Sequence, residues 1–126
     1  MAIDVPIRIH RGADDPAVIW AFENADGSPA NLAGSVFALV IEWLAVPARG
    51  PLPAIEAGAI RHTSELSAAG ALVVDALAGT VTWPITIAES LTIPRGGGAR
   101  YELFRVAGGR TRPWAGGTVA VEGFLP

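Results

Sequence analysis

Apolar and polar residues alternate along much of this chain with a period of two. Every second residue from Ile3 to Ile9 is aliphatic, and Thr80–Ile87 repeats the pattern with Trp83 among its apolar positions. Because successive side chains of a strand point to opposite faces, both segments are predicted to be half-buried strands. The segment Ser35–Val46 is apolar on both faces. It predicts a strand that lies centrally in a sandwich or is covered by another chain.

Clusters of Gly, Pro, Asp and Ser separate these apolar segments. The clearest is Asn24–Gly34, in which Asp26-Gly27 and then Ser28-Pro29 favour a tight reversal of the chain. Thr86 and Glu89 have capping-box spacing, which predicts the start of a short helix. Further strands are predicted at 17–23, 54–62, 71–77, 100–107 and from Thr111 or Gly117 to Phe124, helical turns at 64–69 and 87–93, and loops at 45–53 and 96–98. Short strands at this spacing indicate a single all-β domain over residues 1–126, a sandwich or a barrel.

Composition supports a folded domain that is partly covered by a partner. Hydrophobic residues make up 51% of the 126 residues and charged residues only 17%, the reverse of a disordered chain. A small monomer cannot hide that much apolar area, so some surface is expected to meet another protein. The net charge of −3 argues against nucleic-acid binding. Residues 1–94 hold four Arg and ten acidic residues, whereas 95–126 hold five Arg and two Glu, so one end could meet an acidic surface.

Few residues suggest chemistry. Cys is absent, which excludes disulfides and thiolate nucleophiles. His10 and His62 lack metal-ligand spacing, and no hydrolase motif surrounds His62. The carboxylates that could serve calcium binding or glycoside hydrolysis show no such arrangement and are typical of turns and strand faces; they are Asp14, Asp15, Asp26, Glu42, Glu56 and Glu102. No catalytic residue, metal or cofactor is expected, and neither a secretory signal nor a membrane-spanning segment is predicted.

Four tryptophans are the strongest candidates for packing or contact. Trp20, Trp43 and Trp83 lie on apolar strand faces and are predicted to be core residues. Trp114 is surrounded by turn-forming residues, and two interpretations stay open. It is either an exposed anchor for a partner, near Arg110 and Arg112, or a ring folded back over the sheet edge.

Several turn and strand motifs follow one another in a characteristic order: Arg11-Gly12-Ala13-Asp14, Trp20, Asp26-Gly27-Ser28-Pro29-Ala30-Asn31-Leu32-Ala33-Gly34, Ala78-Gly79-Thr80-Val81, Leu91-Thr92-Ile93-Pro94, Tyr101-Glu102-Leu103, Gly108-Gly109-Arg110 and Gly117-Thr118-Val119-Ala120-Val121. This order resembles the immunoglobulin-like domain at the N-terminus of phage baseplate upper proteins, and related small tail and virion proteins. The resemblance implies an immunoglobulin-like antiparallel β-sandwich of seven or eight short strands with one or two helical turns.

The resemblance also implies a structural, non-enzymatic phage or prophage virion protein, made in the host cytoplasm and built into the tail or baseplate. Such a module would dock neighbouring subunits through loops and sheet edges in a homo-oligomer or symmetric assembly, with no cofactor, nucleic acid or membrane involved. From their expected exposure, the predicted contact residues are Trp114, Arg110, Arg112 and Leu52. A capsid decoration protein is a variant of this prediction. The alternative is a carbohydrate- or ligand-binding sandwich, with Trp114 and Tyr101 stacking on sugar rings.

Overall fold

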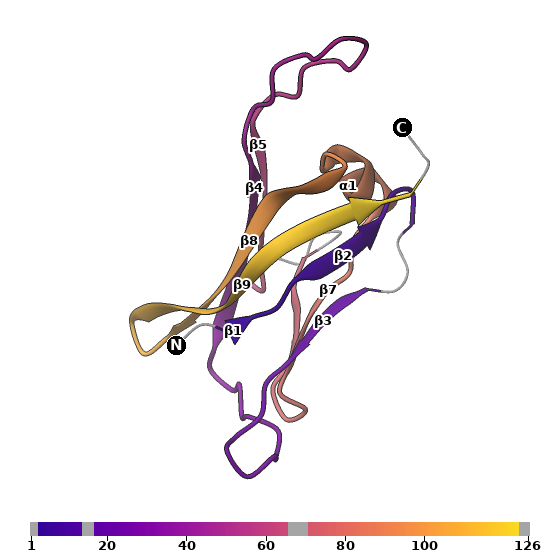
Figure 1. The fold of residues 1–126 in the computed structure, drawn as a ribbon. Helices are drawn as coiled ribbons and strands as arrows, with labels where there is room; N and C mark the ends of the chain where they lie inside the picture. The colour runs from indigo at the N-terminus through magenta and orange to yellow at the C-terminus, as the bar shows by residue number, and fades with distance from the viewer. Residues whose placement is uncertain (1–2, 14–16, 66–70, 124–126) are drawn as a thin grey trace.

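A computed structural model describes residues 3–13, 17–65 and 71–123 (Figure 1). The first sheet contains β1 (Ile3–Asp4), β2 (Ile7–His10), β4 (Val36–Trp43), β5 (Gly58–Thr63), β8 (Gly96–Ala107) and β9 (Arg110–Glu122). The second sheet contains β3 (Val18–Ala21), β6 (Val73–Asp75) and β7 (Thr80–Trp83), and one short helix, α1 (Ile87–Thr92), follows it. The chain is therefore an all-β sandwich, as predicted.

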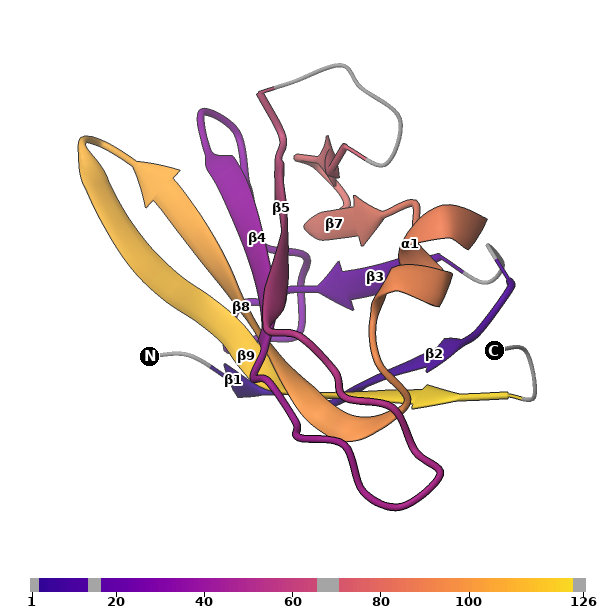
Figure 2. The ribbon, with the colours of Figure 1, turned by 90° about the horizontal axis from the view of Figure 1, so that it is seen from above.

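The strand order is that of an immunoglobulin domain. The large sheet runs β1–β9–β8–β4–β5, with β2 also paired to β9, and the small sheet runs β3–β7–β6. β1 and β2 pair in parallel with successive parts of β9, whereas the other ladders are antiparallel. The small sheet, β3–β7–β6, corresponds to strands B, E and D of an immunoglobulin domain, and β9, β8 and β4 of the large sheet correspond to its strands G, F and C. Figure 2 shows the small sheet and α1 on one side of the large sheet.

The core lies between the two sheets. Phe37, Leu39 and Ile41 of β4 are fully buried on the inner face, opposite Val81 and Trp83 of β7. Each large side chain buried in this way contributes roughly 1.5–3 kcal/mol. Trp20, Trp43 and Trp83 are all buried, which confirms their assignment to the core.

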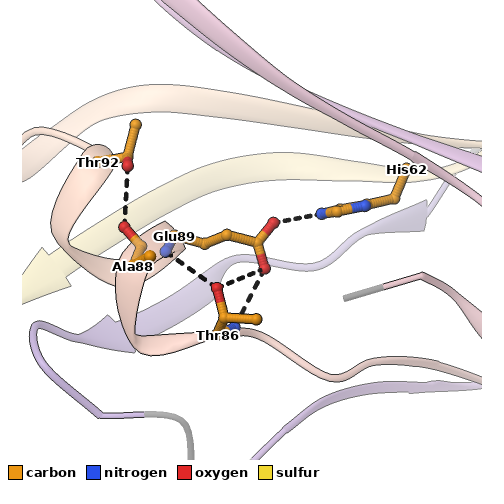
Figure 3. A network of polar contacts seen from close by, with 5 residues as sticks. All are labelled: His62, Thr86, Ala88, Glu89 and Thr92. Atoms are coloured by element: carbon orange, nitrogen blue, oxygen red, sulfur yellow. Dashed lines mark hydrogen bonds and ion pairs between the residues drawn. The ribbon is translucent and has the colours of Figure 1, made fainter. Parts of the chain in front are cut away.

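Helix α1 is held at both ends. The side chain of Thr86 accepts from the backbone N–H of Glu89, and the Glu89 carboxylate accepts from the backbone N–H of Thr86, so the predicted capping box is present (Figure 3). At the other end, the buried guanidinium of Arg11 donates to the carbonyl oxygens of Leu91 and Ile93, at 2.9 and 2.6 Å. A positive charge at these carbonyls suits the negative end of the helix dipole.

Several predicted boundaries differ from the structure. The strand predicted over Ile3–Ile9 is divided into β1 and β2, β6 covers only Val73–Asp75 of the predicted 71–77, and β7 ends at Trp83 rather than at Ile87. Residues 96–98 were predicted to be a flexible connection, but they begin β8, with a register shift between Gly96 and Ala99 that accommodates the extra residue as a bulge. The last strand begins at Arg110, earlier than either predicted start. β5 begins only at Gly58 rather than at residue 54. The predicted helical turn at 64–69 and the predicted strand end at Phe124 fall partly or wholly outside the described residues.

Residues 44–57, here called the arm, connect β4 to β5 and extend past the end of the large sheet (Figure 1). The arm is a narrow hairpin with isolated bridges between Val46 and Ile55 and between Arg49 and Leu52. Its base is tied to the core, because Ile55 packs there and Trp43 donates its indole N–H to the carbonyl of Glu56 at 3.0 Å.

Candidate interaction surface

Trp114 is turned toward the core by a bulge in β9. Leu103 pairs with Ala115 and Phe104 with Pro113, so Trp114 is the extra residue between them. Its ring makes edge contacts with Phe22 and Phe37, at centroid distances of 4.9 and 5.8 Å. The structure therefore has the second of the two arrangements considered for Trp114, the ring folded back over the sheet. Whether Trp114 also contacts a partner stays a prediction.

The guanidinium of Arg105 covers the Trp114 ring from outside. Its central carbon lies 4.4 Å from the ring centroid, and its Nε donates to Ser35 Oγ at 2.7 Å. A cation over an indole face is attracted by the ring quadrupole. The end of the β8–β9 hairpin is thus anchored to the sandwich on the side of Trp114.

The other predicted contact residues lie at two opposite ends of the large sheet. Arg110 and Arg112 are exposed at the β8–β9 turn, and Leu52 is 65% exposed at the tip of the arm. Val36, at the start of β4, pairs with Val106 near the β8–β9 turn, whereas Glu42, near the arm, pairs with Arg100. The antiparallel register therefore separates Leu52 from the two arginines by the length of the sheet, and the predicted residues do not form one site.

Tyr101 is a buried structural residue. It is only 2% exposed, its hydroxyl donates to the carbonyl of Val5, and it accepts the indole N–H of Trp20 at 3.1 Å. Burial raises the pKa of the Tyr101 hydroxyl above its usual value near 10. The prediction that Tyr101 stacks on a sugar is wrong, because Tyr101 is buried and its ring packs against Trp20.

His62 connects β5 to helix α1. Its Nε2 contacts the Glu89 carboxylate (Figure 3). The His62 ring also lies beside Trp83, with 6.1 Å between the ring centroids. The other carboxylate oxygen of Glu89 contacts Thr86. Glu89 therefore lies between His62 and the Thr86 hydroxyl. A nucleophilic hydroxyl needs a direct hydrogen bond to its base, and His62 is separated from Thr86 by this carboxylate. This network suits a structural tie between a strand and a helix.

Of the three candidate calcium ligands, only Asp26 lies among the described residues. The described residues contain no group of three or more His, Asp or Glu side chains able to hold an ion. Asp26 instead accepts from the hydroxyl and the backbone N–H of Ser28, and these hydrogen bonds lower the pKa of its carboxyl. Such bonds close an Asx turn. Asp14 and Asp15 lie outside the described residues.

A groove of about 730 Å³ crosses the outer face of the large sheet. One row of paired residues runs through it from strand to strand, in the order Asp4, Gly116, Glu102, Val40, Arg61. The complete lining is Ile3, Asp4, Val40, Glu42, Arg61, Arg100, Tyr101, Glu102, Phe104, Pro113, Ala115, Gly116 and Gly117. No sequence motif marks this groove, although the apolar outer positions of Ser35–Val46 are a signal for a covered outer face.

The groove combines an apolar wall with charges of both signs. Val40, Phe104 and Pro113 supply apolar surface, and Arg61 pairs with Glu42 at 3.5 Å. Within the described part of the chain, Asp4 and Glu102 make no ion pair. Two carboxylates beside apolar surface can accept a cationic group.

Comparison of the chain with protein-family models and with curated protein sequences gave no match. In the described part of the chain, no helix has the length and apolar character needed to cross a bilayer.

Proposed function

We propose that this chain is a structural, non-enzymatic docking module of a phage or prophage virion, and a component of the tail or baseplate. The virion assignment rests on the resemblance of its turn and strand motifs to phage baseplate upper proteins and related small tail proteins. The docking assignment rests on the surface of the molecule. The virion assignment and the docking assignment have separate experimental tests.

The observation that carries the docking assignment is the arm. Leu44, Val46 and Leu52 are 82, 40 and 65% exposed on a hairpin that extends past the sheet (Figure 1). Exposed aliphatic side chains gathered on one projecting segment are typical of a protein-binding surface. Arg110 and Arg112 project from the opposite end of the same sheet, so the module would bridge two neighbours.

Docking at two ends requires a rigid body between them. The continuous core and the ties of Arg11 and His62 to α1 supply that rigidity. In a symmetric assembly, many small contacts of this kind act together, because each neighbour already bound raises the effective concentration of the next. The mechanism needs no cofactor and no chemical step.

A ligand-binding module is the second candidate, favoured by the groove, whose volume lies in the range of small-molecule sites. The two aromatic residues expected to stack on sugar, Tyr101 and Trp114, both pack into the core. Sugar binding would therefore rely on Phe104 and the charged residues of the groove.

The test of the virion assignment is quantitative mass spectrometry on particles purified from an induced culture of the source strain. A few to a dozen copies per particle would support a tail or baseplate component, and hundreds would favour capsid decoration or a tail tube. Absence from the particles would overturn the virion assignment and favour the ligand-binding module.

The contact residues are tested in the same particles with matched variants. Arg110→Ala/Arg112→Ala is expected to lower incorporation, whereas Arg8→Ala, which removes an exposed side chain of β2, leaves it unchanged. Equal incorporation of both variants would contradict the role proposed for the two arginines.

A further inference from the structure

The tip of the arm is preorganised but uncovered. Arg49 and Leu52 pair through two backbone hydrogen bonds, of 3.1 and 2.9 Å, around Gly50-Pro51. The second bridge, Val46 to Ile55, joins the two sides nearer the base. Prolines at 47, 51 and 53 restrict the backbone further. A segment shaped before it binds loses little conformational entropy on binding.

The groove contains a gap of suitable size for one long side chain. In the row across the sheet, Gly116 separates Asp4 from Glu102. Each strand-to-strand step is about 4.8 Å, so the backbones carrying the two acids are roughly 10 Å apart. A Cβ at Gly116 would lie 3.2 Å from the Tyr101 carbonyl oxygen and 3.8 Å from Glu102 Cγ. The missing side chain therefore keeps the space between the two carboxylates open.

The charges of these two surfaces are complementary, because the acidic residues of the groove, Asp4, Glu42 and Glu102, outnumber its two arginines, Arg61 and Arg100. Arg49 is the charged side chain at the tip, next to the exposed Leu52. Asp4 and Glu102 make no ion pair within the described residues, and Val40 and Phe104 lie beside them in the groove. Arg110 and Arg112, exposed at the β8–β9 turn, have no exposed large hydrophobic residue next to them in the chain. The arm tip thus matches the groove in both charge and apolar surface.

We propose that the arm tip of one copy occupies the groove of a second copy. Arg49 would insert between Asp4 and Glu102, and Leu52 would pack on Val40 and Phe104. The arm extends past the end of its own sheet (Figure 1), whereas the groove lies across the strands of that sheet, which favours contact between copies. Because arm and groove are different surfaces, the contact is heterologous and builds rings or filaments. This inference rests on the docking role proposed above.

The experiment is sedimentation velocity at protein concentrations up to about 1 mM. The wild type is expected to associate as concentration rises. Arg49→Glu in the arm and Glu102→Arg in the groove are each expected to raise the Kd at least about tenfold, because like charges then face each other. The control variant Arg8→Glu, away from both surfaces, associates like the wild type.

A mixture of the two single variants tests the geometry. Arg49→Glu retains an intact groove, and Glu102→Arg retains an intact arm. In the mixture, the wild-type arm of the Glu102→Arg chain meets the wild-type groove of the Arg49→Glu chain, and the two reversed charges also attract each other. We expect the mixture to associate at concentrations where each variant alone stays monomeric. This association also shows that both variants are folded.

Three outcomes would overturn the inference: a wild type that stays monomeric, association that both variants leave unchanged, or variants that weaken association but do not complement each other. The last would indicate a symmetric face-to-face contact. A chain found in virions but monomeric in this assay would leave the proposed function standing and remove only the arm-in-groove contact. Association of the chain in this assay without its incorporation into particles would leave the arm-in-groove contact standing and overturn the virion assignment.

Discussion

The two hairpins of the large sheet differ in how their ends are supported. Both project from the sandwich and both carry Arg and Pro residues. The β8–β9 hairpin returns Trp114 to the core, where the ring contacts Phe22 and Phe37. The arm is anchored at its base by Ile55 but leaves Leu52 exposed at the tip. Stability and binding are therefore separable: Trp114 in the first hairpin tests folding, and Leu52 in the arm tests association.

The largest effect on stability is expected in the β8–β9 hairpin, which Trp114 anchors to the core. Trp114→Ala is expected to lower the free energy of unfolding by about 3 kcal/mol, because it removes a large ring from between Phe22, Phe37 and Arg105. Urea denaturation followed by circular dichroism measures the loss. Trp114→Phe is the matched control and should recover part of it. A loss below about 0.5 kcal/mol for Trp114→Ala would contradict the anchoring role.

The second-largest effect on stability is expected at Tyr101 of β8. Tyr101→Phe is expected to cost about 2 kcal/mol, because the buried Trp20 N–H and the Val5 carbonyl lose their shared partner. The same denaturation experiment at neutral pH measures this cost. An unchanged midpoint would mean that these groups find other partners.

Tyr101 also predicts a pH dependence. Its folded pKa is raised above the usual value near 10, so the unfolded state loses its proton more readily than the folded state. The protonated Tyr101 hydroxyl therefore stabilises the folded state fully below pH 10, and this contribution is lost as the pH rises through the folded pKa. Unfolding midpoints between pH 9 and 11 should fall more steeply for the wild type than for Tyr101→Phe. Parallel curves would contradict a raised pKa.

A smaller effect is expected where β5, the strand that leaves the arm, meets α1. Glu89→Ala removes the reciprocal bond of the capping box and the contact with His62, and is expected to cost about 1.5 kcal/mol. Glu56→Ala, an exposed glutamate in the arm, serves as the control and should be nearly neutral. Equal stabilities would show that the network in Figure 3 does not hold the helix.

The smallest effect on stability is expected at Leu52, at the tip of the arm. Leu52→Ala is expected to change the free energy of unfolding by less than about 0.5 kcal/mol, since the side chain is already exposed. A loss comparable with that of Trp114→Ala would mean that the arm tip supports the fold. The same variant should weaken the self-association proposed for the arm.

Several elements could be predicted from local residues alone. The alternation in Thr80–Ile87 and the positions of Trp20 and Trp83 assigned the inner faces of β3 and β7, because a buried face requires apolar side chains at every second position. The capping box of Thr86 and Glu89 located α1, because its bonds span only three residues. The Asp26–Ser28 turn is closed by equally short contacts.

Other features could not be predicted, because their causes lie far apart in the chain. Gly96-Gly97-Gly98 has the composition of a connection, but pairing with β9 makes it part of a strand. Tyr101 carries no local sign that its hydroxyl binds Val5, 96 residues away. The groove needs five strands side by side before Asp4, Glu102 and Arg61 fall in one row.

The sequence by itself determined the class of fold, most strand positions, the inner face of the small sheet and the start of the helix, since these depend on periodicity and short-range hydrogen bonds. Only the tertiary structure decided the orientation of Trp114, the separation of Leu52 from Arg110 and Arg112, and the existence of the groove. A bulge reverses which face a residue occupies, and the pairing register decides which distant residues become neighbours.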